Sequence, residues 1–159
     1  MVRAKTEARR TFGVDLMNKA LAQRIYQENL DAFSVAFMSG DLIGMIQHTA
    51  IPYLIATRDS EIVMASAEEL DMVMQDMRAQ LLLRGVPIYT RTCIEADFVT
   101  GHRDMIAGCH RTQARDAVKQ RIPPYNTHGV LILMEDGWKW IWLEANLDNA
   151  ELEGLSPDI

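Results

Sequence analysis

The apolar residues in the first quarter of the chain recur at the spacing of a helix. From about Asn18 to Ser39 they fall three or four residues apart, which places one apolar stripe on a helix face: Tyr26, Leu30, Phe33 and Phe37. Gly40 is expected to end this helix, because glycine accepts the left-handed conformation of a C-cap. Asp41 can then cap a second, short helix from Leu42 to about Thr49.

The middle of the chain predicts a pair of strands followed by a third helix. Ile51 to Thr57 is expected to form a strand, and Ile62 to Met64 a short return strand. Ser66-Ala67-Glu68-Glu69 is a capping box, in which the serine and the last glutamate satisfy free amides at a helix start. The helix is expected to continue to about Arg84 and to bury one stripe: Leu70, Val73, Met74, Met77 and Leu81.

From Val86 onward the period of the pattern changes to two, which predicts strands. In the first of them, one face would carry Val86, Ile88, Thr90, Thr92, Ile94, Ala96 and Phe98, and the other Tyr89, Arg91, Cys93, Glu95 and Asp97. A second strand is expected from Met105 to Ala117, and Pro123-Pro124 marks a loop. A hairpin from Thr127 to about Asn146 would turn at Glu135-Asp136-Gly137, because Asp-Gly between apolar runs favours a tight turn.

This order of elements predicts an α+β domain. Consecutive hairpins imply a strongly curved antiparallel sheet, and three helices with one apolar stripe each must cover one of its faces. The sheet would wrap around the helices as a cone and leave a cavity between them. The domain is expected to span residues 18–146, after an N-terminal arm or helix start at 1–17 and before an acidic tail at 147–159.

Composition narrows the class of protein. The 159 residues suit one domain, and the net charge of −6 argues against a nucleic-acid binder. Neither a secretory signal nor an apolar run long enough for a membrane span occurs, so no membrane association is expected. Cys93 and Cys109 fit a reduced, cytoplasmic protein.

The chain resembles the NTF2-like superfamily, which includes SnoaL-like cyclases, ketosteroid isomerases, scytalone dehydratases and limonene epoxide hydrolases. The resemblance rests on the helix end Phe37-Met38-Ser39-Gly40-Asp41-Leu42, on the short helix after it, and on the closing hairpin Glu135-Asp136-Gly137-Trp138-Lys139-Trp140. It implies the cone-shaped α+β fold. It does not imply one function, because this fold carries several kinds of enzyme and also adaptor and assembly domains.

The ketosteroid isomerase chemistry does not carry over. The position of that family's catalytic tyrosine corresponds to Phe33, the strand at 51–57 holds no carboxylate, and no aspartate stands at His128 to Val130. The epoxide hydrolases of this fold activate water with an Asp–Arg–Asp relay, for which this chain offers Arg111, Arg115 and Asp116, with Asp97 as another carboxylate. Because adjacent residues of a strand point to opposite faces, Arg115 and Asp116 would not lie together.

The resemblance to scytalone dehydratases directs attention to histidines and tyrosines. His110, His128, Tyr53 and Tyr125 could approach one another, and histidine suits acid–base chemistry near neutral pH. His128 shares a strand face with Val130, Ile132 and Met134, which makes it the better candidate for facing an apolar interior. The alternative for each histidine is a position in solvent or in a structural hydrogen bond.

No metal site or cofactor is expected, because the four histidines and two cysteines lack ligand spacing. Trp138, Trp140 and Trp142 would lie on one face of the last strand, and its other face is also apolar. Since such a row is unfavourable in water, one face is expected to cover the helices and the other to meet a second subunit.

Two hypotheses follow for function. The first is a homodimer that binds a small, largely apolar organic molecule in the cone, with the option of isomerase, dehydratase, cyclase or hydrolase chemistry. Its catalytic candidates are His128, His110 and Tyr53, and its ligand-binding candidates are Tyr26, Phe33 and Trp140. The second hypothesis is a non-catalytic dimerisation or protein-interaction module of the same fold.

Overall fold

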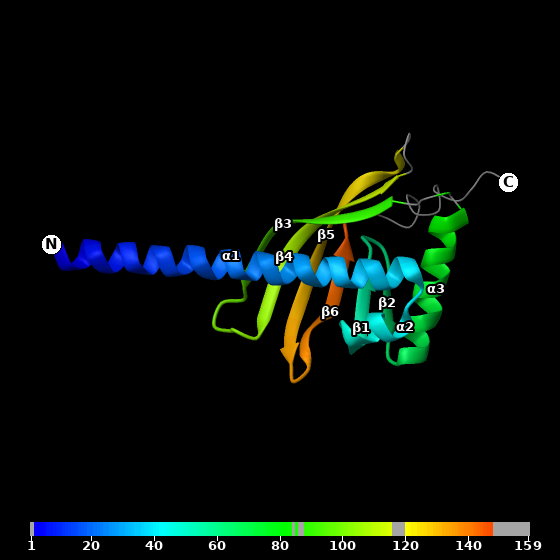
Figure 1. Ribbon diagram of the computed structural model, residues 1–159, viewed down its shortest axis with the longest axis horizontal. Helices are drawn as coiled ribbons and strands as arrows, with labels where there is room; N and C mark the ends of the chain where they lie inside the picture. The colour runs from blue at the N-terminus through cyan, green and yellow to red at the C-terminus, as the bar shows by residue number, and fades with distance from the viewer. Residues whose placement is uncertain (1, 84, 86–87, 116–119, 148–159) are drawn as a thin grey trace.

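The chain folds around one long helix that crosses the concave face of a curved sheet (Figure 1). The computed structural model describes residues 2–83, 85, 88–115 and 120–147. The helices of this part are α1 (Val2–Ser39), α2 (Leu42–Gln47) and α3 (Ala67–Leu83). Its strands are β1 (Thr49–Ala56), β2 (Glu61–Met64), β3 (Ile88–Phe98), β4 (Met105–Arg115), β5 (Gln120–Met134) and β6 (Gly137–Ala145).

The C-terminal end of α1 and the starts of α2 and α3 form where the sequence predicts them. Gly40 takes a φ of +72° after α1, and the Asp41 side chain accepts a hydrogen bond from the Gly44 amide at 3.1 Å. Ser66 Oγ accepts from the Glu69 amide at 3.2 Å, as a capping box requires. The four residues of the α1 stripe are all buried. These local hydrogen bonds and the Gly40 conformation therefore determine where the helices begin and end.

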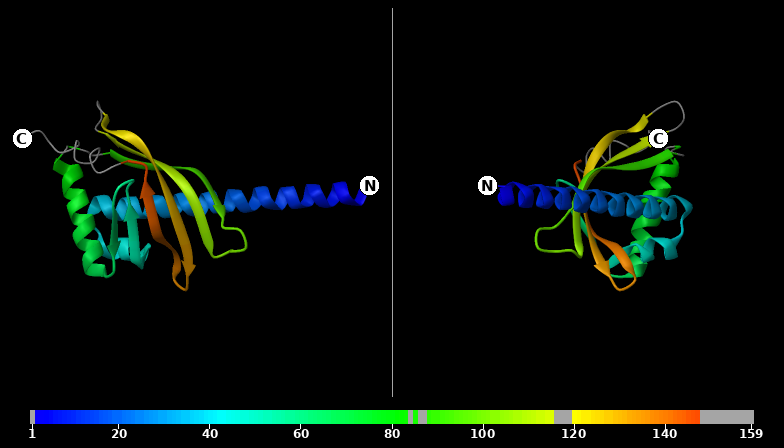
Figure 2. Two further views of the ribbon diagram at one scale, coloured as in Figure 1. Left: turned by 180° about the vertical axis from the view of Figure 1, so that it is seen from behind. Right: turned by 60° about the vertical axis from the view of Figure 1, so that its left-hand side comes forward.

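Helix α1 is longer than its apolar stripe predicts. It begins at Val2 rather than near Asn18, and its first turns project beyond the sheet (Figure 2). In the described part of the chain, none of the helices combines the length and apolarity that a membrane span needs. The expected acidic tail lies outside the described residues, apart from a buried Leu147.

The sheet has the order β2-β1-β6-β5-β4-β3 and is mixed, so the expectation of an antiparallel sheet is wrong at one place. Strand β1 runs parallel to β6, while the other neighbours are antiparallel. Hairpins force consecutive strands to be antiparallel, but β1 and β6 are separated by all the residues from Thr57 to Asp136. No turn therefore dictated their relative direction.

A bulge in β6 separates the tryptophans that the sequence places on one face. Val130 pairs with Trp142, and the next residue, Leu131, pairs with Trp140, which leaves Ile141 as an extra residue. One extra residue moves the following side chains to the opposite face. Trp140 is therefore buried against the helices, whereas Trp142 lies with Val130 on the outer face.

A second bulge changes which side chains of β3 face the helices. Cys93 pairs with His110 and Glu95 with Cys109, so Ile94 is the extra residue. Arg91, two residues before Cys93, consequently faces inward and is buried, together with Ala96 beyond the bulge. The uninterrupted alternation predicts the opposite: it places Arg91 on the face away from Ala96.

The expected loop at Pro123-Pro124 is part of strand β5. Thr112 pairs with Tyr125 and Ala114 with Ile122, so the prolines lie at an irregularity of the ladder. Bulges are among the few places where a sheet tolerates proline, because an unpaired position requires no amide donor.

Helix α1 contacts the sheet most closely through Tyr26. Its ring lies over Gly108 of β4 and Gly129 of β5, where an added Cβ atom would come within 2.7 Å of the tyrosine at either position. Trp140 packs edge-on against the same ring, with ring centroids 4.9 Å apart. The two glycines thus allow helix and sheet to approach, and this contact fixes the depth of the space between them.

We expect Gly129→Ala to destabilise the protein by about 1–3 kcal/mol, because the new methyl group would overlap Tyr26, Trp140 and Leu143 in a packed core. Urea unfolding followed by circular dichroism measures this loss. Ala107→Val, which adds carbon to an exposed position of β4, serves as the control and should change the free energy of unfolding far less. Equal stability of Gly129→Ala and the wild type would contradict the close approach.

Candidate functional site

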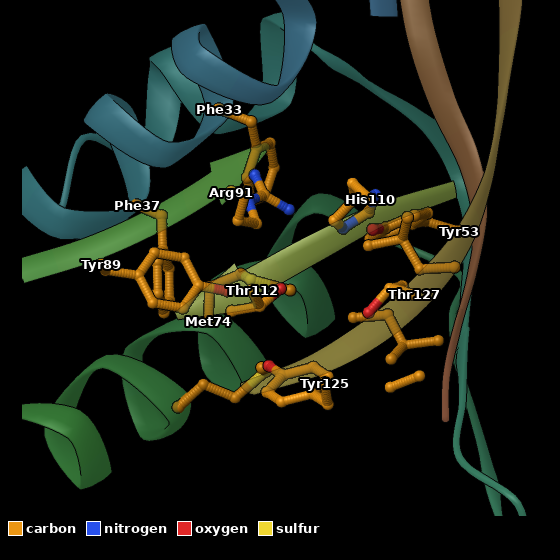
Figure 3. A pocket seen from close by; sticks show the side chains of 14 residues that line it. Phe33, Phe37, Tyr53, Met74, Tyr89, Arg91, His110, Thr112, Tyr125 and Thr127 are labelled. Carbon is orange, nitrogen blue, oxygen red and sulfur yellow. The ribbon is translucent and has the colours of Figure 1, made fainter. Parts of the chain in front are cut away.

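A cavity of about 80 Å³ lies between α1, α3 and the concave face of the sheet (Figure 3). Its walls combine apolar and polar side chains from elements far apart in the sequence. The apolar part comprises Phe33, Phe37, Ile55, Met74, Met77, Leu143 and Ala145. The polar part comprises Tyr53, Tyr89, Arg91, His110, Thr112, Tyr125 and Thr127.

His110 is the histidine of the cavity. The inward register of β4 leaves its side chain 1% exposed, and its Nδ1 lies 2.7 Å from the Tyr26 hydroxyl. Burial, followed by the positive charge of Arg91 and by His128, lowers the pKa of His110 to about 3. The imidazole is therefore neutral over the physiological pH range.

Tyr26 sets the tautomer of that imidazole. Burial raises the pKa of Tyr26 far above its ordinary value, so the hydroxyl keeps its proton. We infer that it donates to Nδ1 of His110, which assigns the ring proton to Nε2. No described residue hydrogen-bonds to this Nε2.

Among the described residues of the cavity wall, Arg91 is the one that carries a charge, and it is only 7% exposed. Its Nε donates to Ser34 Oγ at 2.9 Å, and its Nη2 donates to the Leu30 carbonyl at 3.3 Å. The guanidinium carbon also lies 5.5 Å from the centre of the Phe33 ring and 5.8 Å from that of Tyr89. Within the described residues no carboxylate pairs with it.

The remaining polar groups of the wall are hydroxyls. Tyr53 is fully buried on β1, and burial raises its pKa, so the group is a neutral donor. Burial likewise raises the pKa of Tyr125, so its hydroxyl also keeps its proton. Thr127 of β5, which pairs with His110 of β4, is buried as well. The cavity thus offers several hydrogen-bond groups and one positive charge.

The structure separates the six candidate residues of the sequence analysis. His110, Tyr53 and Phe33 line the cavity. Tyr26 and Trp140 are buried behind His110 and are absent from the lining, with ring centroids 5.7 Å and 6.3 Å from the imidazole. These two residues can position His110 without touching a ligand.

The expected order of the two histidines is reversed. His128 is exposed, because it pairs with Cys109 and Glu144 on the outer face of the sheet. Val130, which shares a strand face with His128 and suggested an inward position for it, lies on the outer face of the sheet, and this face is itself partly apolar. The sequence analysis did not identify Arg91 as a cavity residue, because an alternating pattern does not reveal the bulge after Cys93 that turns Arg91 inward.

The other arrangements considered from the sequence do not meet at this cavity. Arg111 is exposed, with its Nη1 3.3 Å from Asn126 Oδ1, and Asp97 is exposed on β3. Asp116 lies outside the described residues, as does Ala117 of the expected second strand. Among the described residues, no group of three His, Cys, Asp or Glu side chains could hold a metal ion.

Solved structures match this architecture closely although their sequences differ. No family model matches the chain, and no curated protein matches it in sequence. A cystatin-like domain of unknown function from Nostoc punctiforme superposes with a TM-score of 0.62 at 10% identity, over 80% of this chain and 78% of that one.

Two further matches carry names that suggest a role. A proposed ketosteroid isomerase from Shewanella frigidimarina has a TM-score of 0.56 at 19% identity, over 75% of this chain and 92% of its own. A proposed calcium/calmodulin-dependent protein kinase type II association domain from Thiobacillus denitrificans has a TM-score of 0.56 at 13% identity, over 76% and 92%. Identities this low establish architecture alone. The resemblance seen in the sequence is thereby confirmed at the level of fold: the chain has the NTF2-like, cystatin-like α+β fold.

Proposed function

We propose that this protein binds a small organic molecule in the cavity beneath α1. The observation that supports the proposal is the convergence of His110, Tyr53 and Arg91 on one cavity whose walls also include apolar side chains from α1, α3, β1 and β6. Ligand sites in proteins combine an apolar lining with a few placed polar groups, and these buried polar groups gain partners when a ligand enters.

The size of the cavity limits the ligand. At about 80 Å³ it is smaller than the roughly 300–1,000 Å³ of sites for drug-sized molecules. It holds several waters or an organic molecule of a few heavy atoms. A larger ligand would have to displace the rim, where Met77 of α3 is 40% exposed. The proposed ligand is therefore at the small end of the largely apolar organic molecules that the sequence suggested.

In this proposal His110 contacts the ligand as a neutral hydrogen-bond donor through Nε2. A base with a pKa of about 3 is weak at neutral pH, so the site favours binding over proton abstraction. Burial is the larger cause of this low pKa and the charge of Arg91 is the second, so a bound molecule that offsets this charge raises the pKa of His110 only in part.

Filling the cavity should abolish ligand binding. Ala145→Leu adds a branched side chain to the cavity wall, while Ala107→Leu adds the same group to an exposed site and is the matched control. Saturation-transfer NMR with a mixture of small alcohols, amides and carboxylates should detect binding to the wild type and to Ala107→Leu only. Equal binding by Ala145→Leu, checked for folding by circular dichroism, would place the ligand elsewhere.

The neutral state of His110 predicts a pH dependence of stability. Between pH about 6.5 and 3 the unfolded chain binds a proton at this histidine and the folded protein does not, so stability falls as the pH falls. The loss attributable to His110 is about 1.4 kcal/mol per pH unit within this window.

Urea unfolding at pH 5 and pH 7 measures this loss for the wild type, His110→Gln and His128→Gln. We expect the wild type and His128→Gln, which alters an exposed histidine, to lose stability more steeply than His110→Gln. Identical pH dependence for all three proteins would show that His110 is not held neutral.

A second candidate function is assembly, and it has its own observation. Val63, Leu54, Trp142 and Val130 follow one another across the outer face of β2, β1, β6 and β5, where they form an apolar row. We propose that this row meets a second copy of the chain, in keeping with the association domain among the similar folds. Such a dimer is compatible with ligand binding on the concave face.

Trp142→Glu should therefore reduce the oligomeric state, because it places a charge in the middle of the row. Sedimentation velocity measures the mass in solution. Thr92→Glu changes an exposed position near the β3 edge of the sheet and should leave the mass unchanged. A wild-type monomer, or an unaltered dimer of Trp142→Glu, would contradict assembly through this face.

A further inference from the structure

We propose that the molecule bound in this cavity carries a carboxylate, and that the guanidinium of Arg91 recognises it. The inference rests on the proposed function of the cavity and names the chemical class of its ligand: a short-chain organic acid. It is drawn from the charge of Arg91, with which no carboxylate of the described residues pairs, from the hydrogen-bond donors around it and from the size and lining of the cavity.

The charge balance of the cavity is positive. A guanidinium carries a positive charge in proteins, and among the described residues the lining includes no aspartate or glutamate. His110 beside it is neutral. Burying an ion is unfavourable unless an opposite charge or strong hydrogen bonds compensate it. A negatively charged ligand would supply the missing opposite charge.

The hydrogen bonds of Arg91 leave donors for such a ligand. A guanidinium has five N–H groups, of which one at Nε binds Ser34 and one at Nη2 binds the Leu30 carbonyl. Three N–H groups remain among the interactions of the described residues. Guanidinium and carboxylate are planar groups that form two parallel hydrogen bonds, a match that a lysine or a hydroxyl cannot offer.

The guanidinium is held in position by helix α1. Gln27 donates from Nε2 to the Arg91 carbonyl at 3.0 Å and accepts at Oε1 from the Cys93 amide at 2.7 Å. Phe33 and Tyr89 flank the guanidinium, while Ser34 anchors its Nε. The charge is therefore oriented before any ligand arrives, which lowers the entropic cost of binding.

The rest of the cavity fits the remainder of an organic acid. Figure 3 shows Arg91, His110, Tyr53 and Thr127 around one space, with Met74 and Tyr125 on its opposite side. The hydroxyls and the His110 Nε2 can bind the second carboxylate oxygen or a polar substituent. Leu143 and Ile55 offer apolar contact to a short carbon chain. Inorganic phosphate would leave this apolar surface unused, so a carboxylate with a small apolar tail is the better match.

Propionate and propionamide provide the matched test, because they have nearly the same shape and differ in charge. Calorimetric titration at low ionic strength should show propionate binding at least about tenfold more tightly than propionamide. Arg91→Gln should remove this preference while binding of propionamide changes little. Arg111→Gln, which removes an exposed arginine from the outer face, should keep the preference.

Three further outcomes decide the inference. Equal binding of the two probes by the wild type overturns the carboxylate assignment and leaves the proposed ligand site standing. Binding of neither probe, nor of any molecule in the NMR mixture, overturns both. Tighter binding of inorganic phosphate than of propionate also overturns the assignment. Should Arg91→Gln fail to fold, Arg91→Lys keeps the charge without the planar fork and should bind propionate more weakly than the wild type.

Discussion

The close packing of Tyr26 against two glycines sets the distance between helix α1 and the sheet, on which the shape of the cavity depends. Because Gly108 and Gly129 have no side chains, the Tyr26 ring reaches the floor of the sheet, and its hydroxyl meets the imidazole of His110. Phe33 and Phe37 follow two and three turns later on the same helix face, and their side chains line the cavity above the concave surface of the sheet. The cavity is the space left where this contact holds the helix at one end and the sheet curves away at the other.

Local signals predicted the helices well, because caps and apolar stripes involve residues that are neighbours in the sequence. Gly40, Asp41 and Ser66 mark helix ends by hydrogen bonds that reach no further than a few residues. The direction of β1 relative to β6 and the two bulges depend instead on partners far along the chain. Around Ile94 and Ile141 the residues suit either face, so the alternating pattern contains no sign of the extra residue.

The sequence therefore predicted the types of residue that line the candidate site better than it predicted which particular residues do so. His110, Tyr53 and Phe33 were identified because histidine and aromatic residues within an expected strand or helix suggest a ligand site. Arg91 was not, since one inserted residue moves it from the solvent face to the interior. A buried arginine costs free energy of desolvation, and in the part of the chain that the structure describes Arg91 is held by hydrogen bonds and ring contacts without a carboxylate partner.

The side-chain amide of Gln27 also affects how copies of this chain can meet. Strand β3 lies at the end of the sheet order, so one row of its backbone groups faces away from β4. Gln27 occupies the Arg91 carbonyl and the Cys93 amide of that row, in the way that a neighbouring strand would. An edge occupied in this manner is a poor template for another strand, which protects the sheet from growing sideways into aggregates.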